Sequence, residues 1–376
     1  MRSLYVHIPF CREKCNYCDF VSDKASRAQR EAYLALLVRE GELYRNLAPK
    51  DGLSTIFFGG GTPSLLRPED FAFLLDCFRN SFGFDSDMEI TVEANPEGIG
   101  GSYCKELYSL GINRISFGAQ AFQDHLLKAM GRRHRSDDIA KAVSLARESG
   151  FSNINLDLIY GLPGQTMADW RESLVAAASL PITHLSTYGL KLSQASPWGR
   201  RLSAGDLSLP HEDLNADMQL YAMDFLEGQG IHRYEIANFA KSGFKCRHNL
   251  AYWRRQDYLG LGLNASSLLS RDVRTRNYSS MNFYRDAVER GTFPHEEKEN
   301  LSDQEVMEEE LFLSLRLVEG ISLKSFEEKY GYNFFTQKKG QMVKLFEAGL
   351  IIVEKDQLKI TNRGVLLNNE IASLLI

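Results

Sequence analysis

Three cysteines, Cys11, Cys15 and Cys18, stand within eight residues of one another near the start of the chain. Their C-x3-C-x2-C spacing directly follows a short apolar run, so we expect them on a loop behind a strand. Thiolates are the usual ligands of iron–sulfur clusters, and a [4Fe–4S] cluster needs four ligands. Three thiolates on one loop would therefore hold three corners of such a cluster and leave one iron open to a ligand that is not protein.

A zinc site is the alternative interpretation of these cysteines. Structural zinc sites usually combine two pairs of ligands, and no second pair of cysteines exists in this sequence. Cys246 and His248 could complete a site, but they lie far downstream. The number and spacing of the thiols favour an iron–sulfur cluster.

A glycine-rich segment forms a second unusual loop, again directly after an expected strand: Gly59, Gly60, Gly61, Thr62 and Pro63. Glycine lets a ligand approach the backbone closely and leaves N–H donors unhindered. The segment lacks the Gly-Lys-Ser/Thr ending of a phosphate-binding P-loop. A plain tight turn between strand and helix is the alternative interpretation.

Polar residues that could contact a ligand also lie in or just after later strands, namely Glu93, Gln120 and Asp157, with Arg132 further along. Caps and ion pairs are the ordinary roles of such residues. Asp157 is less ordinary, because it interrupts an apolar run at 154–159. A carboxylate there is costly to bury unless it is paired or contacts a ligand, for which ribose hydroxyls are suitable.

The first half of the chain alternates strand and helix patterns. We expect strands at 4–8, 55–58, 89–93, 114–117, 155–159 and 184–190, and helices around 33–38 and at 68–79, 102–110, 137–149 and 167–179. Six such units in series predict a parallel sheet with helices outside it. A full or partial barrel and an open doubly wound sheet are the rival arrangements, and in both the loops at the carboxyl ends of the strands form the active-site face.

A second candidate cluster lies at 246–253, where the sequence reads Cys-Arg-His-Asn-Leu-Ala-Tyr-Trp. Residue chemistry alone favours a surface turn with an ordinary histidine and two packing aromatic side chains. The functional alternative gives His248 the role of an axial nitrogen ligand to haem iron. Tyr252 and Trp253 would then offer flat apolar surface to the macrocycle.

The last part of the chain changes pattern. We expect helices at 303–317, 323–330 and 336–348, then strands at 350–354 and 357–360, which is typical of a winged helix-turn-helix. Residues 297–376 hold ten Lys or Arg and fourteen Asp or Glu, a net charge of −4. Phosphate backbones attract the opposite sign. We therefore expect no nucleic-acid partner, and interpret the domain as a lid or a docking surface for a protein.

Composition sets the general frame. The 376 residues are 44% hydrophobic and 25% charged, with a net charge of −5, and no stretch is long and apolar enough for a membrane span. No signal peptide is expected, so we predict a cytoplasmic protein, where clustered cysteines point to metal or catalysis. We divide the chain into a barrel at 1–192, a linker and histidine-motif region at 193–300, and the winged-helix-like domain at 301–376.

These motifs together resemble the radical S-adenosylmethionine (SAM) superfamily, and within it the oxygen-independent coproporphyrinogen III oxidase family. The resemblance covers nearly the whole chain and rests on Tyr-Val-His-Ile-Pro-Phe-Cys at 5–11, the next two cysteines, the loop at 59–63 and Asp-Leu-Ile-Tyr-Gly-Leu-Pro at 157–163. It implies an α/β fold with a partial (β/α)6 barrel. It also implies a [4Fe–4S] cluster whose open iron takes the amino and carboxylate groups of SAM.

Two features resemble a haem-chaperone subgroup of that family rather than the oxidase itself. The oxidase has a fourth cysteine two positions after the third, where this chain has Phe20. The subgroup carries a His-Asn-x-x-Tyr-Trp haem motif, which His248, Asn249, Tyr252 and Trp253 match. The resemblance therefore implies haem binding and delivery, with oxidative decarboxylation of coproporphyrinogen III as the alternative. An iron–sulfur regulator acting through the winged module is a third hypothesis, which the acidic charge weighs against.

The resemblance also assigns residues. It implies cluster ligation by Cys11, Cys15 and Cys18, SAM contacts from Tyr5, Gly60, Gly61, Thr62, Glu93, Gln120, Arg132 and Asp157, and haem contacts from His248, Asn249, Tyr252 and Trp253. It implies haem-requiring apoproteins such as respiratory enzymes as recipients, and leaves room for transient contact with membrane proteins and for a homodimer. The chain departs from relatives at Asn264-Ala265-Ser266-Ser267, where they read Gly-Ala-His-Ser, so the role of that loop stays open.

Overall fold

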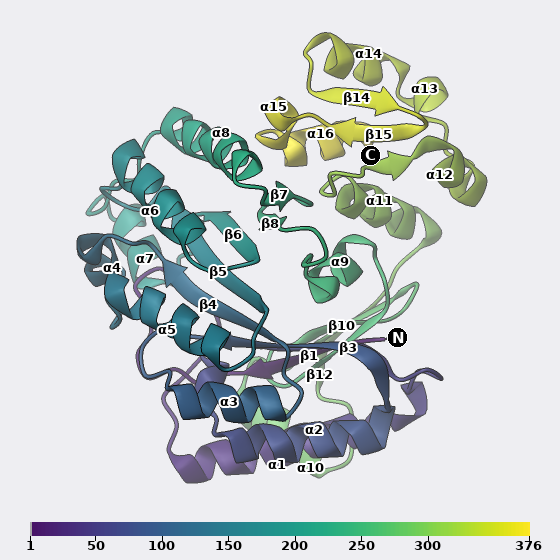
Figure 1. Ribbon diagram of the computed structural model, residues 1–376. Coiled ribbons are helices and arrows are strands. Elements are labelled where there is room, and N and C mark those ends of the chain that lie inside the picture. The colour runs from purple at the N-terminus through teal and green to yellow at the C-terminus, as the bar shows by residue number, and fades with distance from the viewer. Residues whose placement is uncertain (1) are drawn as a thin grey trace.

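A curved sheet dominates the computed structural model, which describes residues 2–376 (Figure 1). The six strands expected from the sequence lie side by side in chain order and run parallel. They are β1 (Ser3–Ile8), β2 (Leu53–Gly60), β3 (Phe84–Ala94), β4 (Arg114–Gln120), β5 (Asn153–Tyr160) and β6 (His184–Gly189). A strand order that never reverses has no switch point of the kind found in doubly wound sheets. The partial barrel is therefore confirmed.

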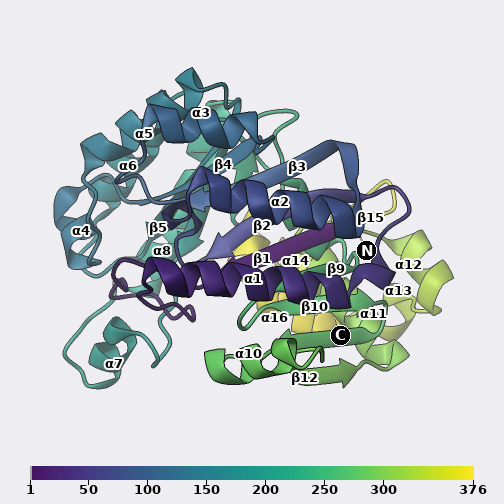
Figure 2. The same cartoon turned by 90° about the horizontal axis from the view of Figure 1, so that it is seen from below.

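Helices cover the outer face of this sheet, as Figures 1 and 2 show. The covering helices are α1 (Arg27–Leu43), α2 (Pro68–Phe82), α3 (Gly101–Ser109), α4 (Asp124–Ala129), α5 (Ser136–Glu148) and α6 (Met167–Ser179). Helix α2 illustrates why they pack: Phe71, Leu74, Leu75 and Phe78 recur at helical spacing and are buried. Further along the chain are α7 (Pro197–Ser203) and α8 (Glu212–Gly228).

The side chains of strand β1 alternate between the two faces of the sheet. Leu4, Val6 and Ile8 are fully buried in the core beneath the helices. Side chains alternate along a strand, so Tyr5 and His7 point to the concave face. The same alternation aims polar side chains of the neighbouring strands into the barrel.

Strands that the sequence did not predict extend the sheet beyond β1. β9 (Tyr258–Leu261) pairs parallel with β1, and β10 (Ser266–Ser270), β11 (Val273–Asn277) and β12 (His295–Asn300) follow antiparallel, with α10 (Met281–Glu289) between the last two. β7 (His232–Arg233) and β8 (Asn238–Ala240) lie beyond β6 at the other edge. The region 193–300, predicted from the sequence to be a linker and histidine-motif region, therefore also supplies strands to the sheet of the barrel.

A buried carboxylate fastens the added strands to the barrel. Glu40 of α1 accepts hydrogen bonds from the backbone N–H of Gly262 (2.8 Å), the hydroxyl of Tyr284 (2.6 Å) and Nδ2 of Asn277 (2.6 Å). Burial raises the pKa of Glu40 to about 7, although these three donors favour its charged form. Glu40 thus joins α1, α10 and the sheet extension.

The C-terminal region is built as the sequence predicts, from helices and a small antiparallel sheet. It contains α11 (Asp303–Ser314), β13 (Ile321–Ser322), α12 (Leu323–Tyr330), α13 (Phe334–Gln337), α14 (Lys339–Glu347), β14 (Ile351–Glu354), β15 (Gln357–Ile360), α15 (Asn362–Val365) and α16 (Asn368–Leu375). The expected helix at 336–348 is divided between α13 and α14. Among residues 2–376, no helix has the length and apolar character needed to cross a membrane.

Candidate functional site

The loops at the carboxyl ends of β1 to β6 line one cavity of ≈ 380 Å³. Most residues singled out from the sequence meet there: Cys11, Cys15, Cys18, Gly60, Gly61, Thr62, Glu93, Gln120, Arg132 and Asp157. They come from distant parts of the chain and converge because parallel strands end at the same edge of the sheet. Tyr5 is the exception among the expected SAM contacts, since it lines the two neighbouring cavities instead.

The glycine loop is fastened to the chain that leads into the cysteines. Gly61 N–H donates to the carbonyl of Ile8 (2.9 Å), and Thr62 N–H donates to that of Phe10 (2.8 Å). A Cβ atom at Gly61 would lie 2.7 Å from the Phe10 carbonyl oxygen, closer than real side chains come. The Thr62 hydroxyl also lies 3.6 Å from Sγ of Cys11. Glycine is therefore required for the cysteine loop and this loop to sit together.

Arg132 connects the cysteine loop to the strand ends. Its Nη2 donates to the side-chain oxygen of Asn95 (2.8 Å) and the carbonyl of Gly118 (2.6 Å), and its Nη1 lies 3.6 Å from Sγ of Cys15. The planar guanidinium can make these contacts at once because its donors have a fixed fork geometry. Arg132 therefore places a positive charge beside the thiols.

Two carboxylates lie at the floor of the cavity. Glu93 accepts from Gly60 N–H (3.1 Å), and Asp157 accepts from the Ser116 hydroxyl and from Nδ2 of Asn155, both at 2.9 Å. Burial, and then the nearby charge of Asp157, raise the pKa of Glu93 to about 8. The raised pKa favours the neutral form of Glu93 at pH 7, which can both donate and accept hydrogen bonds.

Gln120 ends β4 in an unusual backbone conformation. Its φ is 66°, in the left-handed region that non-glycine residues seldom adopt. Such conformations cost on the order of 1–3 kcal/mol and persist where the surrounding structure requires them. Its side chain lines the cavity, so the strain coincides with a predicted ligand-binding position.

The donor set fits a cluster better than a single metal ion. Three thiols line the same cavity, beside an arginine that can offset the negative charge of thiolates. Within residues 2–376, no three Cys, His, Asp or Glu side chains converge closely enough to hold one metal ion. Zinc requires its ligands around a single point, whereas each corner of a [4Fe–4S] cluster takes its own thiolate.

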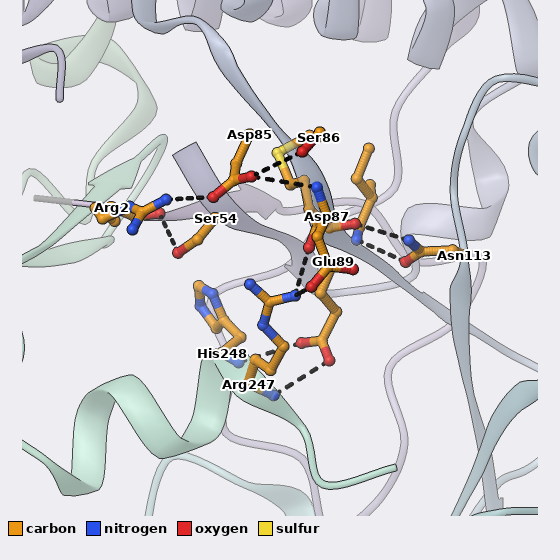
Figure 3. A network of polar contacts seen from close by, with 11 residues as sticks. Arg2, Ser54, Asp85, Ser86, Asp87, Glu89, Asn113, Arg247 and His248 are labelled. Carbon is orange, nitrogen blue, oxygen red and sulfur yellow. Dashed lines mark hydrogen bonds and ion pairs between the residues drawn. The ribbon is translucent and has the colours of Figure 1, made fainter. Parts of the chain in front are cut away.

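The histidine motif lies elsewhere, on α9 (Arg247–Trp253), at the amino ends of β2 and β3. Glu89 of β3 caps this helix: its carboxylate accepts from the backbone N–H groups of Arg247 and His248, both at 3.1 Å, as Figure 3 shows. The Arg247 guanidinium also pairs with Asp87 (3.1 Å). The motif therefore closes the barrel at the end opposite the cysteine loop.

His248 is almost fully buried, and both of its ring nitrogens have partners. Nδ1 lies 2.8 Å from the Thr55 hydroxyl, and Nε2 lies 2.8 Å from the Tyr252 hydroxyl. Burial, and then the charge of Arg114, lower the pKa of His248 to about 3, so the ring is neutral. A neutral imidazole can ligate iron, but here the lone pair would become available only after one of these contacts breaks.

The other motif residues face different surroundings. Asn249 and Tyr252, together with His248, line an internal cavity of ≈ 200 Å³ whose other wall holds Glu93 and Asp157. Trp253 instead lies under the guanidinium of Arg316, 5.4 Å from the ring centroid. The structure thus brings three of the four predicted haem residues into one space, close to the floor of the cysteine cavity.

Comparison with known proteins shows which family this chain belongs to. Residues 5–177 match the Radical SAM superfamily model, and residues 301–367 match the HemN C-terminal domain model. "Heme chaperone HemW" from Bacillus subtilis is 38% identical, covering 99% of this chain and 98% of the relative, and that from Lactococcus lactis is 35% identical, covering 98% and 96%. The chain belongs to the HemW family. Membership in the radical SAM superfamily implies that the family scaffold binds a [4Fe–4S] cluster and SAM.

The structure resembles that of a related enzyme. Coproporphyrinogen III oxidase (HemN) from Escherichia coli, a radical SAM enzyme, superposes with a TM-score of 0.86 at 26% sequence identity, covering 99% of this chain and 89% of that one. The relation confirms the resemblance inferred from the sequence. Its 26% identity is lower than the 35–38% identity to the relatives named Heme chaperone HemW.

Two residues of this HemW-family chain, Phe20 and Asn264, stand where the resemblance led us to expect other residue types. Phe20, where the resemblance to the oxidase led us to expect a cysteine, is 60% exposed and lines both the cysteine cavity and a second cavity along β1. Asn264, where the resemblance led us to expect a glycine, has a φ of 58°. Asparagine is one of the few residues that adopt this conformation readily. Asn264 therefore suits the backbone conformation that the loop has in this structure.

Sequence reasoning missed the buried polar chain that joins the two ends of the barrel. Asn155 donates to Ser116 (2.6 Å), its side-chain oxygen lies 2.6 Å from Nδ1 of His184, and Nε2 of His184 lies 2.8 Å from the Tyr234 hydroxyl. That hydroxyl accepts from the backbone N–H of Cys246 (3.3 Å), just before α9. Polar residues at alternate positions of apolar strands were the available signal, and only Asp157 was recognised.

Proposed function

We propose that this chain is a haem chaperone, which binds haem and transfers it to haem-requiring apoproteins on a radical SAM scaffold. The observation that carries the proposal is the match to relatives named Heme chaperone HemW over 98–99% of this chain, together with the His-Asn-x-x-Tyr-Trp segment. Phe20 in place of the oxidase's fourth cysteine supports the same conclusion.

The cofactor cavity would hold the cluster through Cys11, Cys15 and Cys18. SAM would take the open iron and contact Gly60, Gly61, Thr62, Glu93, Gln120, Arg132 and Asp157, with Tyr5 close behind. When bound, the cluster supplies a Lewis-acidic, redox-active iron to SAM. This chain's own residues orient SAM and exclude water from it.

The haem would bind beside α9. The sequence predicts His248 as an axial ligand, and this requires the Tyr252 hydroxyl to leave Nε2. Tyr252 lines both the internal cavity of His248 and the larger cavity along β1. A rotation of this one side chain would therefore expose the histidine nitrogen to a ligand.

Paired variants test this assignment. Tyr252→Phe removes the hydroxyl that occupies Nε2 and keeps the aromatic ring, so we expect it to bind hemin at least as tightly as the wild type. His248→Ala should shift the Soret band and weaken binding, while His211→Ala at an exposed position should do neither. Unchanged hemin binding and spectrum in His248→Ala would show that the axial assignment is wrong.

Oxidative decarboxylation of coproporphyrinogen III is the second candidate, favoured by the likeness to HemN. The two are separated by reconstituting the cluster anaerobically and measuring hemin binding and coproporphyrinogen turnover on the same preparation. We expect stoichiometric hemin binding without decarboxylation. Robust turnover would contradict the chaperone proposal.

Delivery is the step that makes the protein a chaperone. We propose that it works in the cytoplasm and passes haem to apoproteins such as respiratory enzymes, through transient contact with membrane proteins, and that it can form a homodimer. Transfer is measured as gain of activity of an apo respiratory enzyme mixed with the hemin-loaded protein. Gain no faster than with free hemin at the same concentration would argue against delivery.

A further inference from the structure

A second cavity, of ≈ 350 Å³, lies along the concave face of β1 between α9 and α11. Its walls include the aromatic side chains of Tyr5, Phe20, Tyr252 and Tyr258. A concave space of this size, with apolar and aromatic walls and a few polar groups, is typical of small-molecule sites. Flat apolar walls suit a planar ring system.

Two arginines and one carboxylate supply the charge of this cavity. Glu309 of α11 pairs with Nε of Arg255 (2.7 Å) and with the guanidinium of Arg274. One carboxylate between two guanidinium groups leaves one positive charge uncompensated. His7 also lies in the wall of this cavity. Burial lowers its pKa, so its imidazole adds no positive charge at neutral pH.

One donor in this group is unused. The side chain of Arg255 is only 3% exposed, and within residues 2–376 its Nη2 has no hydrogen-bond partner. A buried guanidinium N–H without an acceptor costs free energy that a ligand oxygen would recover. The uncompensated positive charge and the free N–H of Arg255 both favour a ligand with an anionic oxygen. A carboxylate is suitable because its two oxygens match the paired N–H groups of a guanidinium.

We propose that this cavity is where the chain holds haem, with one haem propionate bound by Arg255 and Arg274. The inference rests on the proposed haem-chaperone function and adds the position and orientation of the ligand. The ring would lie against Tyr5, Tyr252 and Tyr258, and its edge would reach Phe20, which also borders the cysteine cavity. Before haem binds, Tyr252 separates this cavity from His248, and its rotation away from Nε2 would let His248 reach the haem iron.

The C-terminal domain contributes Glu309 to this site. Glu309 already occupies part of the donor set that the propionate would use, so the two carboxylates compete for the same guanidinium groups. Removing the charge of Glu309 should therefore favour haem, and removing the charge of Arg274 should disfavour it. A merely structural role of the ion pair predicts the same sign for both changes.

The test is a hemin titration of the cluster-reconstituted full-length protein, followed by Soret absorbance. We expect Arg274→Gln to weaken hemin binding roughly tenfold, the effect of losing one charge-assisted hydrogen bond. Glu309→Gln should strengthen binding several-fold. Hemin dimethyl ester, which lacks the carboxylates, should bind the wild type and both variants alike.

Arg254→Gln is the matched control, because Arg254 neighbours Arg255 in sequence but pairs with Glu319 and lines a different cavity. We expect it to bind hemin as the wild type does. The proposal is overturned if both charge variants weaken hemin binding, if neither changes it, or if the ester responds as hemin does. Absence of hemin binding by the wild type would instead contradict the proposed function itself.

Discussion

Arg132 shows how single residues organise the cofactor cavity. Its guanidinium contacts a cysteine sulfur, Asn95 after β3 and the backbone of Gly118 in β4. Lysine could replace its charge but offers one point of donation rather than a planar fork. The geometry of the guanidinium, more than its charge, therefore holds the cysteine loop against the strand ends.

We expect Arg132→Lys to weaken SAM binding to the reconstituted protein by about tenfold, because one or two charge-assisted hydrogen bonds are lost. Isothermal titration with SAM measures the change. Arg133→Lys is the control, since Arg133 is half exposed and pairs only with Glu13 at the surface. Equal affinity of the Arg132 variant and the wild type would remove Arg132 from the SAM site.

At the scale of the element, α9 depends on a residue far away in sequence. A seven-residue helix is too short to be stable alone, and its first N–H groups need acceptors. Glu89 of β3 provides them from the barrel interior (Figure 3). The position of His248 is thus set by a strand residue as well as by its own helix.

Glu89→Ala should lower the free energy of unfolding by about 1–3 kcal/mol, because it leaves buried backbone donors without an acceptor. Hydrogen exchange of the amides at 247 and 248 should accelerate as well. Asp87→Ala, which removes only the exposed partner of Arg247, should change stability by less than about 0.5 kcal/mol. Urea unfolding compares the two, and similar losses in both would contradict the capping role.

At the scale of the whole molecule, two buried carboxylates couple stability to pH. Burial raises the pKa of Glu40 to about 7 and that of Glu93 to about 8. The unfolded chain releases these protons near pH 4.5, so between that pH and about 8 the folded state binds more protons. Stability is therefore greatest on the acidic side of this window and falls as pH rises through it.

We expect the cluster-free protein to lose stability between pH 5.5 and 8.5, and Glu93→Gln to lose less. Glutamine keeps an acceptor for Gly60 N–H and cannot ionise, so at pH 8.5 the variant should exceed the wild type by about 1 kcal/mol or more. Urea unfolding at the two pH values measures this, with exposed Glu69→Gln as control. An equal pH dependence in wild type and Glu93→Gln would show that Glu93 does not titrate as described.

Much of the fold could be predicted because its signals are local. The apolar runs of β1 to β6 and the helical spacing in α2 record burial directly, and Leu323–Tyr330 and Gln357–Ile360 have the bounds expected. β12 could not be found this way: its residues are His-Glu-Glu-Lys-Glu-Asn, nearly all exposed at the edge of the sheet. This segment is a strand because its backbone pairs with β11.

The sequence by itself indicated that the loops after β1 to β5 would share one cavity, because parallel strands bring the loops after them to the same edge of the sheet. Only the tertiary structure decided what surrounds His248 and how Glu309 lies between Arg255 and Arg274. Thr55 and His248 are 193 positions apart in the sequence, and Arg255 and Glu309 are 54 positions apart. Their geometry depends on how the barrel, α9 and α11 pack, and no local pattern of residues encodes that packing.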